Sequence, residues 1–326
     1  MLSLEGVTKT YRVGAFGTAT LTAVDDVSLD LAPGEVVSLI GESGSGKTTL
    51  GKTVLGLLRP TRGVITLDGA PARPGKAYYR HVQGVFQDPF SCYNPVFKAD
   101  RVLRMIRDEY FPGVADSEWD GRIDTSLKDV GLDPGQILGR YPHQLSGGQL
   151  QRLLIARALL LDLRYLVADE ITSMLDASTR IDVLNLLADL KSRGLGVLFV
   201  THDLSLGNYI SERAVVLYRG RVVESGPTGM VFGNPLHPYT ARLLSSVPRL
   251  TARWNGEPAA PARVSGEGPS TLVEAEPGHF VRRDKPDERT EQDERTERTE
   301  RTERTERTER DERTERDDTT STGSVN

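Results

Sequence analysis

A stretch rich in glycine and serine, Gly41 to Thr48, has the residue types that bind phosphate groups. It fits the pattern of a glycine, four residues and then Gly-Lys-Ser/Thr. The glycines let backbone N–H groups wrap an anion, and a helix that opens at Thr48 adds the partial positive charge of its N-terminus. Lys47 can reach the outer phosphates, and the Thr48 hydroxyl can ligate magnesium. The pattern therefore predicts binding of a nucleoside triphosphate, for which we take ATP, together with Mg²⁺.

The predicted elements on either side of this loop are the ones that such a site requires. The apolar run Glu35 to Ile40 predicts a strand that ends at the loop, and Thr48 to Leu58 predicts a helix that leaves it. Further β-rich runs at Tyr165 to Ala168, Val197 to Thr201 and Ala214 to Tyr218 are accompanied by a helical stretch at Ser178 to Ser192. This alternation indicates an α/β fold with a largely parallel sheet.

Two adjacent carboxylates, Asp169 and Glu170, follow the apolar run Tyr165 to Ala168. Asp169 is placed to hold the magnesium shell, and Glu170 can polarise an attacking water. Paired acids at a strand end are usually solvated turn residues, but a phosphate loop in the same chain favours the catalytic interpretation. No motif for binding a phosphate acceptor is visible, so we expect a hydrolase rather than a kinase.

A second run of small residues, Leu145-Ser-Gly-Gly-Gln149, precedes a predicted helix from Leu150 to Leu161. Such a helix N-terminus suits an anion. Taken alone, the segment is better interpreted as a plain helix cap, with Ser146 as the capping residue.

The same run, followed by Gln151-Arg152 and placed between the phosphate loop and the two acids, resembles the signature of the ATP-binding cassette (ABC) family. The resemblance covers residues 1 to about 250. It implies a P-loop NTPase core of the ABC type, with a helical subdomain insert and a small C-terminal extension.

The resemblance can be extended to four further positions. Gln87 is similar to the glutamine that meets magnesium and water, and Ser173 to Asp176 to the loop that crosses to a partner nucleotide domain. His202 is similar to the histidine that contacts the γ-phosphate, and Tyr11 to the aromatic that stacks on adenine. Each of these residues has an ordinary structural interpretation when it is taken alone. Their order and spacing carry the resemblance.

The resemblance thus implies a complete set of roles. The nucleotide would be bound by Tyr11, Gly41, Glu42, Ser43, Gly44, Ser45, Gly46, Lys47, Thr48 and Thr49. A partner's ATP would be contacted by Ser146, Gly147, Gly148 and Gln149, and Asp176 would lie in the inter-subunit loop. Magnesium would be held by Thr48, Gln87 and Asp169, and catalysis would be carried out by Glu170, His202 and Gln87.

Two positions depart from the family pattern. Ile171 stands where the family usually has proline, and Met174 where it usually has alanine. Neither replaces a group that contacts nucleotide. Both can alter the turn that positions Glu170 and Asp176, so the rate of hydrolysis is left open.

Three segments outside the catalytic motifs are similar to the ATPases of dipeptide, oligopeptide and nickel importers. They are Gln87 to Pro95, Tyr141 to Gln144, and Asn234 to Pro248 with its His-Pro-Tyr-Thr element. That element alone could be a surface turn made by two prolines. Together the segments imply an ATPase subunit of an importer for peptides or a related solute such as nickel.

In this family one nucleotide is closed between the phosphate loop of one subunit and the signature of another. The resemblance therefore implies a dimer with a second copy or a paralogue. It also implies two integral membrane permease subunits, an extracytoplasmic solute-binding protein, and a peripheral position on the cytoplasmic face of the membrane. Two alternatives stay open: a soluble ABC ATPase that acts on chromosomes or ribosomes, and an ATP-sensing regulatory module.

Composition and charge exclude other classes of protein. Residues 284–318 carry 16 acids and 10 bases, which leaves the rest of the chain near +1 against a total of −5. The chain outside residues 284–318 therefore lacks the basic stripe of a nucleic-acid binder, so no nucleic-acid partner is expected.

The first residues do not resemble a secretory signal, which predicts a cytosolic start. The single cysteine, Cys92, is expected to be buried.

The organisation expected along the chain has three parts. Residues 1–233 form the ATPase domain, with a helical subdomain at about 89–161. Residues 234–283 form a Pro-rich extension without long apolar strands, which could hold a short helix from Thr240 to Val247. Residues 284–326 form a tail with a Glu/Arg/Thr repeat from Glu294 to Arg310, and since the repeat has no apolar residues to offset its ordering entropy, we expect the tail to be disordered.

Overall fold

A computed structural model describes residues 1–13, 19–246 and 270–284 of the chain. Within it, residues 1–13, 19–246 and 272–282 belong to one compact unit. The Glu/Arg/Thr repeat lies outside the described residues, so its disorder stays a prediction.

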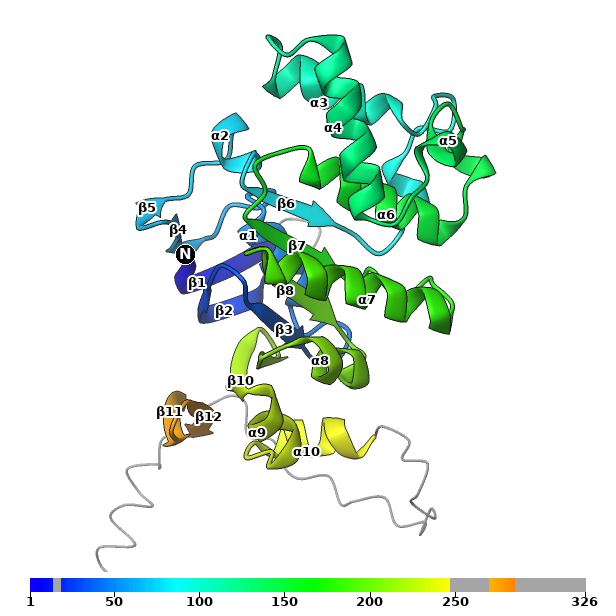
Figure 1. Ribbon diagram of the computed structural model, residues 1–326. Coiled ribbons are helices and arrows are strands. Elements are labelled where there is room, and N and C mark those ends of the chain that lie inside the picture. Colours follow the sequence, from blue (N-terminus) through cyan, green and yellow to red (C-terminus); the bar gives the residue numbers. More distant parts are fainter. Residues whose placement is uncertain (14–18, 247–269, 285–326) are drawn as a thin grey trace, which may run out of the picture. The chain divides into compact units, whose positions relative to one another are not determined.

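A four-stranded antiparallel sheet is formed mostly by the N-terminal residues, and β1 and β2 are its longest strands (Figure 1). Leu2, Leu4 and Val7 of β1 are buried and belong to the core beneath this sheet. The strand order is β2-β1-β4-β5, with bounds β1 Leu2–Val13, β2 Ala19–Leu31, β4 Arg62–Leu67 and β5 Ala70–Pro71.

An eight-stranded mixed sheet forms the centre of the chain, in the order β11-β12-β10-β9-β3-β8-β7-β6. The five strands from β9 to β6 are parallel to one another, whereas β10 is antiparallel to both β9 and β12. The bounds are β3 Val36–Ile40, β6 Val82–Val85, β7 Tyr165–Asp169, β8 Gly196–Thr201, β9 Arg213–Tyr218, β10 Arg221–Pro227, β11 Ser270–Glu276 and β12 His279–Asp284. The sequence-based strands at 35–40, 165–168, 197–201 and 214–218 therefore agree with the structure to within a residue.

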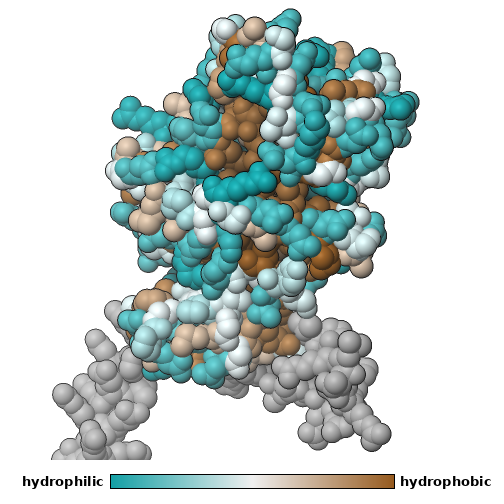
Figure 2. Space-filling view, viewed as in Figure 1, coloured by the Kyte–Doolittle hydropathy of each residue, from teal (hydrophilic) through white to brown (hydrophobic). Residues whose placement is uncertain are grey.

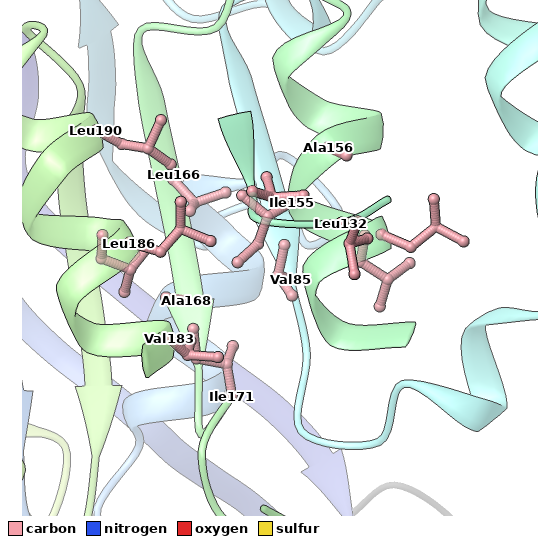
Figure 3. Packing of buried hydrophobic residues seen from close by; sticks show 14 of the residues in the cluster. Val85, Leu132, Ile155, Ala156, Leu166, Ala168, Ile171, Val183, Leu186 and Leu190 are labelled. Atoms are coloured by element: carbon pink, nitrogen blue, oxygen red, sulfur yellow. The ribbon is translucent and has the colours of Figure 1, made fainter. Parts of the chain in front are cut away.

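The central parallel strands are buried on both faces. Along β8, Val197 and Phe199 enter one hydrophobic cluster, and Leu198 and Val200 enter another. This alternation follows from the two-residue repeat of a strand, and it explains why β7 and β8 are continuous apolar runs. Figure 3 shows the first cluster, where side chains from β6, β7, α6 and α7 meet.

The helices cover the sheets and connect their strands. The α-helices are α1 Lys47–Val54, α2 Lys76–Tyr79, α3 Arg101–Tyr110, α4 Asp116–Asp129, α5 Pro134–Ile137, α6 Gly147–Leu159, α7 Ala177–Ser192, α8 Leu204–Ile210, α9 Thr228–Gly233 and α10 Pro238–Ser245; two 3₁₀ turns are η1 Phe90–Cys92 and η2 Pro142–Gln144. Among the described residues, no helix is both long and apolar enough to cross a membrane.

Between β6 and β7 the described chain is helical, as the sequence predicts for about 89–161. Its core is centred on Trp119 of α4, which is fully buried, contacts Phe111 and donates from Nε1 to the Leu103 carbonyl at 3.1 Å. Figure 2 shows a mostly hydrophilic face on which apolar residues gather between this helical part and β6. The buried residues of the helical part, α6 included, belong to the same hydrophobic cluster as residues of β6 and β7.

The C-terminal residues contain more strand than the sequence suggests. The expected short helix is present as α10, but β11 and β12 were not expected. β12 pairs with the edge of the central sheet, where Val281 lies opposite Glu224 and Phe280 opposite Ser225. A segment this short forms a strand because β10 offers it an edge, and its own sequence does not carry that information.

Two smaller expectations were wrong. Cys92 is exposed, because it ends the surface turn η1, where its Sγ lies 3.6 Å from the Asp88 carbonyl. The helix predicted to reach Leu58 ends at Val54, because the N–H groups of Leu57 and Leu58 both turn back to the Lys52 carbonyl.

We expect Trp119→Ala to lower the free energy of unfolding by about 3–5 kcal/mol, because it leaves a cavity at the centre of the helical part. Urea unfolding followed by circular dichroism measures this. Met105→Ala is the matched control, because Met105 lies on α3 and is 55% exposed. Equal losses in the two variants would contradict the packing described here.

Candidate functional site

The phosphate loop connects the end of β3 to the start of α1, as the sequence predicts. Gly46 caps α1 with a left-handed backbone (φ 106°), and a Cβ there would lie 2.2 Å from the Ala23 carbonyl of β2. Only glycine fits both the conformation and the approach of β2. The first N–H groups of α1, beginning at Lys47, have no acceptor within the helix. They supply donors for an anion at the loop.

Two polar side chains of the loop lie inside it. Lys47 is 5% exposed, and its Nζ donates to the carbonyls of Gly41 at 2.7 Å and Glu42 at 2.9 Å. Burial lowers the Lys47 pKa, while Glu170 and Asp169 act to raise it. The Ser45 hydroxyl is buried and has no hydrogen-bond partner in the described part of the chain. A buried hydroxyl without a partner is costly, so it fits a loop that receives a polar ligand.

Asp169 and Thr48 face each other across the two elements that carry them. The Thr48 Oγ1 lies 3.5 Å from Asp169 Oδ1, at the outer limit of a hydrogen bond. Asp169 is 6% exposed, and burial raises its pKa; the Thr48 contact acts in the opposite direction, and Glu170 raises the pKa further. A hydroxyl and a buried carboxylate held together are oxygen ligands of the kind that Mg²⁺ prefers. The two residues present therefore fit the metal.

Glu170 and His202 form a contact at the ends of neighbouring strands. His202 Nδ1 lies 3.1 Å from Glu170 Oε1, and the two side chains are 59% and 21% exposed. Both line one small pocket, together with Thr201 and Asp203. A carboxylate that is oriented by an imidazole and open to solvent on one side can accept a proton from water.

The backbone of Glu170 is in the left-handed region, with φ 51°, which is uncommon for a residue with a side chain. Its N–H donates to the Val200 carbonyl at 2.9 Å, and its carbonyl accepts from Ser173 N and Oγ at 3.1 and 2.9 Å. These bonds hold the residue in a conformation that costs energy.

Of the two residues that depart from the family pattern, one is buried and the other is exposed. Ile171 is 1% exposed, and Figure 3 shows it beside Val183 of α7. Met174 is 61% exposed. Ile171 therefore anchors the turn by apolar packing, at the position where a proline would restrict it by its ring.

Four strand ends bring the predicted catalytic residues to one edge of the sheet. Strands β3, β8, β7 and β6 are parallel neighbours, with Ile40 opposite Thr201, Val200 opposite Asp169, and Ala168 opposite Val85. The phosphate loop, His202, Glu170 and Gln87 follow these ends in that order. Ligands of parallel sheets bind at the carboxyl ends of the strands. Gln87 is exposed there.

The signature segment starts α6 and forms a complete capping box. Ser146 Oγ accepts from Gln149 N at 3.2 Å, and Gln149 Oε1 accepts from Ser146 N at 2.9 Å. The helix-cap interpretation is therefore present in the structure. At Gly148 a Cβ would lie 2.5 Å from Thr179 Cγ2, so the packing of α6 on α7 also requires a glycine. The proposed contact of this segment, Gly147 included, with a partner's nucleotide stays a prediction.

Asp176 caps α7, a role that sequence reasoning did not assign. Its carboxylate accepts from Ser178 Oγ at 2.7 Å and from Thr179 N and Oγ1, both at 2.9 Å. These hydrogen bonds lower the Asp176 pKa to about 2. The residue is exposed and ionised, and its part in an inter-subunit loop stays a prediction.

Tyr11 lies on the antiparallel sheet, half-buried on β1 and opposite Leu21 of β2. The Lys9 Nζ lies 5.3 Å from the centre of its ring. The same β2 strand approaches the phosphate loop at Gly46 through the Ala23 carbonyl. Stacking of Tyr11 on adenine stays a prediction.

One contact with the phosphate loop was missed. The Tyr239 hydroxyl accepts a hydrogen bond from the Glu42 N–H at 2.9 Å. The His-Pro-Tyr-Thr pattern drew attention to this tyrosine, but no sequence signal connects two residues 197 positions apart.

Two family models match the chain. The ABC transporter model matches residues 24–173, and the model for the oligopeptide/dipeptide transporter C-terminal region matches residues 223–272. A Brucella ovis protein with the provisional name of peptide import ATP-binding protein is 44% identical over 255 residues, which are 76% of this chain and 78% of that protein. A Brucella abortus protein with the same provisional name is 43% identical over 263 residues, 78% of this chain and 77% of the relative.

Solved structures resemble the fold as well. A bacterial ABC transporter cassette solved as a dimer is 31% identical, with a TM-score of 0.62 over 70% of this chain and 99% of that cassette. An ABC transporter subunit from Clostridium perfringens is 26% identical, with a TM-score of 0.62 over 72% and 90%. The expected α/β fold with a P-loop core of the ABC type is confirmed. With this fold, a matching family model and relatives that share more than two thirds of their length with it, the chain belongs to the ABC transporter family of ATP-binding proteins.

Proposed function

We propose that the chain is the ATP-hydrolysing subunit of an importer that takes up peptides or a related solute such as nickel. The observation that carries this proposal is the pair of matches along one chain: an ABC transporter match over residues 24–173 and an oligopeptide/dipeptide transporter match over residues 223–272. The names of the Brucella relatives, peptide import ATP-binding proteins, support the same solute class.

The phosphate loop supplies the binding energy for ATP. The N–H groups at the start of α1 and the Lys47 ammonium are donors for the phosphate oxygens. Lys47 donates to two loop carbonyls, so its Nζ already lies within the curve of the loop. The ammonium has three N–H donors, so one remains for a charge-assisted contact with phosphate.

Mg²⁺ would be held by Thr48 and Asp169, with Gln87, two residues after the end of β6, as a further oxygen ligand. When bound there, Mg²⁺ would supply positive charge that offsets the charge of the phosphates. Burial raises the Asp169 pKa, and the Thr48 hydroxyl and Lys47 act in the opposite direction.

Glu170 acts as the general base for the attacking water. Its carboxylate is 21% exposed, so water reaches it, and His202 holds one of its oxygens at 3.1 Å. The strained turn at Glu170 fixes the direction of the side chain before nucleotide binds. His202, which follows the neighbouring strand end, would contact the γ-phosphate.

A second nucleotide domain completes the site. Ser146 to Gln149 begin α6 in the helical part, whereas the phosphate loop begins α1. A partner's signature segment would cover the loop of this chain, and this chain's signature would cover the partner's loop. Asp176, in the turn between β7 and α7, would contribute to that contact. The solved relative that is a dimer supports this arrangement.

Membrane permease subunits would dock on the segment that follows Gln87. Phe90, Val96 and Phe97 are 48%, 73% and 44% exposed there, although large apolar side chains tend to be buried. Exposed apolar side chains that lie together mark protein–protein interaction sites. Because these follow the proposed catalytic residue Gln87, a partner bound to them would respond to ATP. Such a partner places the chain on the cytoplasmic face of the membrane, with an extracytoplasmic solute-binding protein choosing the cargo.

Deleting the gene should abolish uptake of di- and oligopeptides, or of nickel, by the cell. Uptake of labelled peptides and of ⁶³Ni²⁺ measures this, with re-expression of the intact gene as the positive control. Unchanged uptake of both solute types would contradict the proposed solute class without affecting the assignment as an ABC ATPase.

Glu170→Gln should lower the ATPase kcat about 100-fold or more, because the amide cannot accept the proton of the attacking water. ATP affinity should be kept, and ATP should trap a dimer that gel filtration detects. Glu118→Gln is the control, since Glu118 is an exposed residue of α4 that forms an ion pair with Arg122. Near-normal turnover in Glu170→Gln would refute its role as the base.

Asp169→Asn should raise the Mg²⁺ concentration needed for half-maximal activity about tenfold or more, because a neutral amide replaces a charged ligand. A Mg²⁺ titration at saturating ATP measures this, and chelation by EDTA should abolish activity in both proteins. An unchanged Mg²⁺ requirement would remove Asp169 from the metal site.

A further inference from the structure

The C-terminal residues contact the phosphate loop through one hydroxyl group. The Glu42 N–H donates to Tyr239 Oη at 2.9 Å. Tyr239 is fully buried in the first turn of α10, in the region matched by the transporter C-terminal model. The proposed chemistry of the site, built from loop, Glu170 and His202, leaves this contact without a role.

The bond holds a peptide group that is also held at its other end. The Gly41 carbonyl, which belongs to the same peptide unit as the Glu42 N–H, accepts from Lys47 Nζ at 2.7 Å. A peptide plane with both polar groups engaged is fixed in orientation, because rotation would break two hydrogen bonds. This peptide opens the loop, so its orientation sets the path of the backbone that follows.

Tyr239 is itself held rigidly. Its ring packs on Tyr218 at the end of β9, with 4.2 Å between ring centres. The Arg242 guanidinium lies 5.6 Å from the ring centre. The Tyr239 backbone N–H donates to His237 Nδ1 at 3.1 Å. These contacts hold the ring and the backbone of Tyr239 in place, and thereby hold its hydroxyl at the Glu42 N–H.

The buried carboxylate of Glu224 connects the start of α10 to the sheet. Glu224 of β10 is fully buried and accepts from the N–H groups of Leu236 at 2.8 Å and His237 at 2.9 Å. His279 of β12, also fully buried, places its Nε2 2.7 Å from Glu224 Oε1. A buried carboxylate is stable only when it is hydrogen-bonded, as it is here. It fixes the start of α10, and hence Tyr239, against β10 and β12.

We propose that Tyr239 is a positioning residue of the nucleotide site, whose hydroxyl preorganises the Gly41–Glu42 peptide for ATP. Preorganisation increases affinity because less ordering is left to occur on binding. The proposal rests on the assignment of Gly41 to Thr49 as the nucleotide site. It makes the C-terminal region a part of the ATPase site, in addition to any role in transport.

The test replaces Tyr239 by Phe in the full-length chain, which removes the hydroxyl and keeps the ring. Tyr78→Phe is the matched control, because Tyr78 is 5% exposed and its hydroxyl also bonds a backbone group, the Val54 carbonyl at the end of α1. The Kd for ATP and for ADP should rise about fivefold in Tyr239→Phe, the worth of one hydrogen bond, and stay at the wild-type value in Tyr78→Phe. The kcat should change less than about twofold, since the loop binds ground and transition states alike.

A second readout does not depend on activity. Hydrogen exchange at the Glu42 amide should accelerate in Tyr239→Phe and not in Tyr78→Phe, with similar thermal midpoints in the two variants. A wild-type Kd in Tyr239→Phe would overturn the proposal. A smaller fraction of protein able to bind ATP, with an unchanged Kd, would also overturn it, because a merely structural role gives that result.

Lys47→Ala separates this proposal from the one on which it rests. If Lys47→Ala loses ATP affinity while Tyr239→Phe keeps it, only the role of Tyr239 is refuted. If Lys47→Ala also binds ATP as the wild type does, the assignment of the loop as the nucleotide site fails, and the role of Tyr239 fails with it.

Discussion

The parallel pairing of β3, β8, β7 and β6 is the constraint on which the candidate site depends. These strands are buried on both faces, and slipping any of them by one residue would exchange the side chains of two hydrophobic clusters. The register is therefore held by packing far from the chemistry. As a result the residues after Ile40, Val85, Asp169 and Thr201 emerge together at one edge, although more than a hundred residues separate the first from the last.

The helical part between β6 and β7 is coupled to this edge by its position in the chain. It leaves the sheet just after Gln87 and returns through α6, which begins at the signature segment and ends just before β7. A movement of the helical part would therefore be felt at Gln87 and at the start of β7. The buried residues around Trp119 belong to the same hydrophobic cluster as residues of β6, β7 and β8, so packing also joins the helical part to the sheet.

At the turn after β7, hydrogen bonds and apolar packing hold a strained backbone conformation in place. Glu170 adopts a positive φ that hydrogen bonds to Val200 and Ser173 hold in place. Ile171 contributes buried apolar contact there, so the turn does not depend on a proline at that position. The departure at 171 is thus accommodated by the core, whereas the Met174 side chain is exposed.

The sequence by itself determined the elements and residues whose signals are local. Glycines, Lys47 and Thr48 at fixed spacing specify a phosphate loop, apolar runs of about five residues specify strands buried on both faces, and adjacent acids mark a strand end. The tertiary structure alone decided the contacts that join distant segments: the Glu170–His202 pair, the β12 strand on the β10 edge, the exposure of Cys92, and the bond from Tyr239 to Glu42. The physical reason is that hydrogen bonds and burial depend on which surfaces meet. A local pattern encodes the surface of each element but not the partner that covers it.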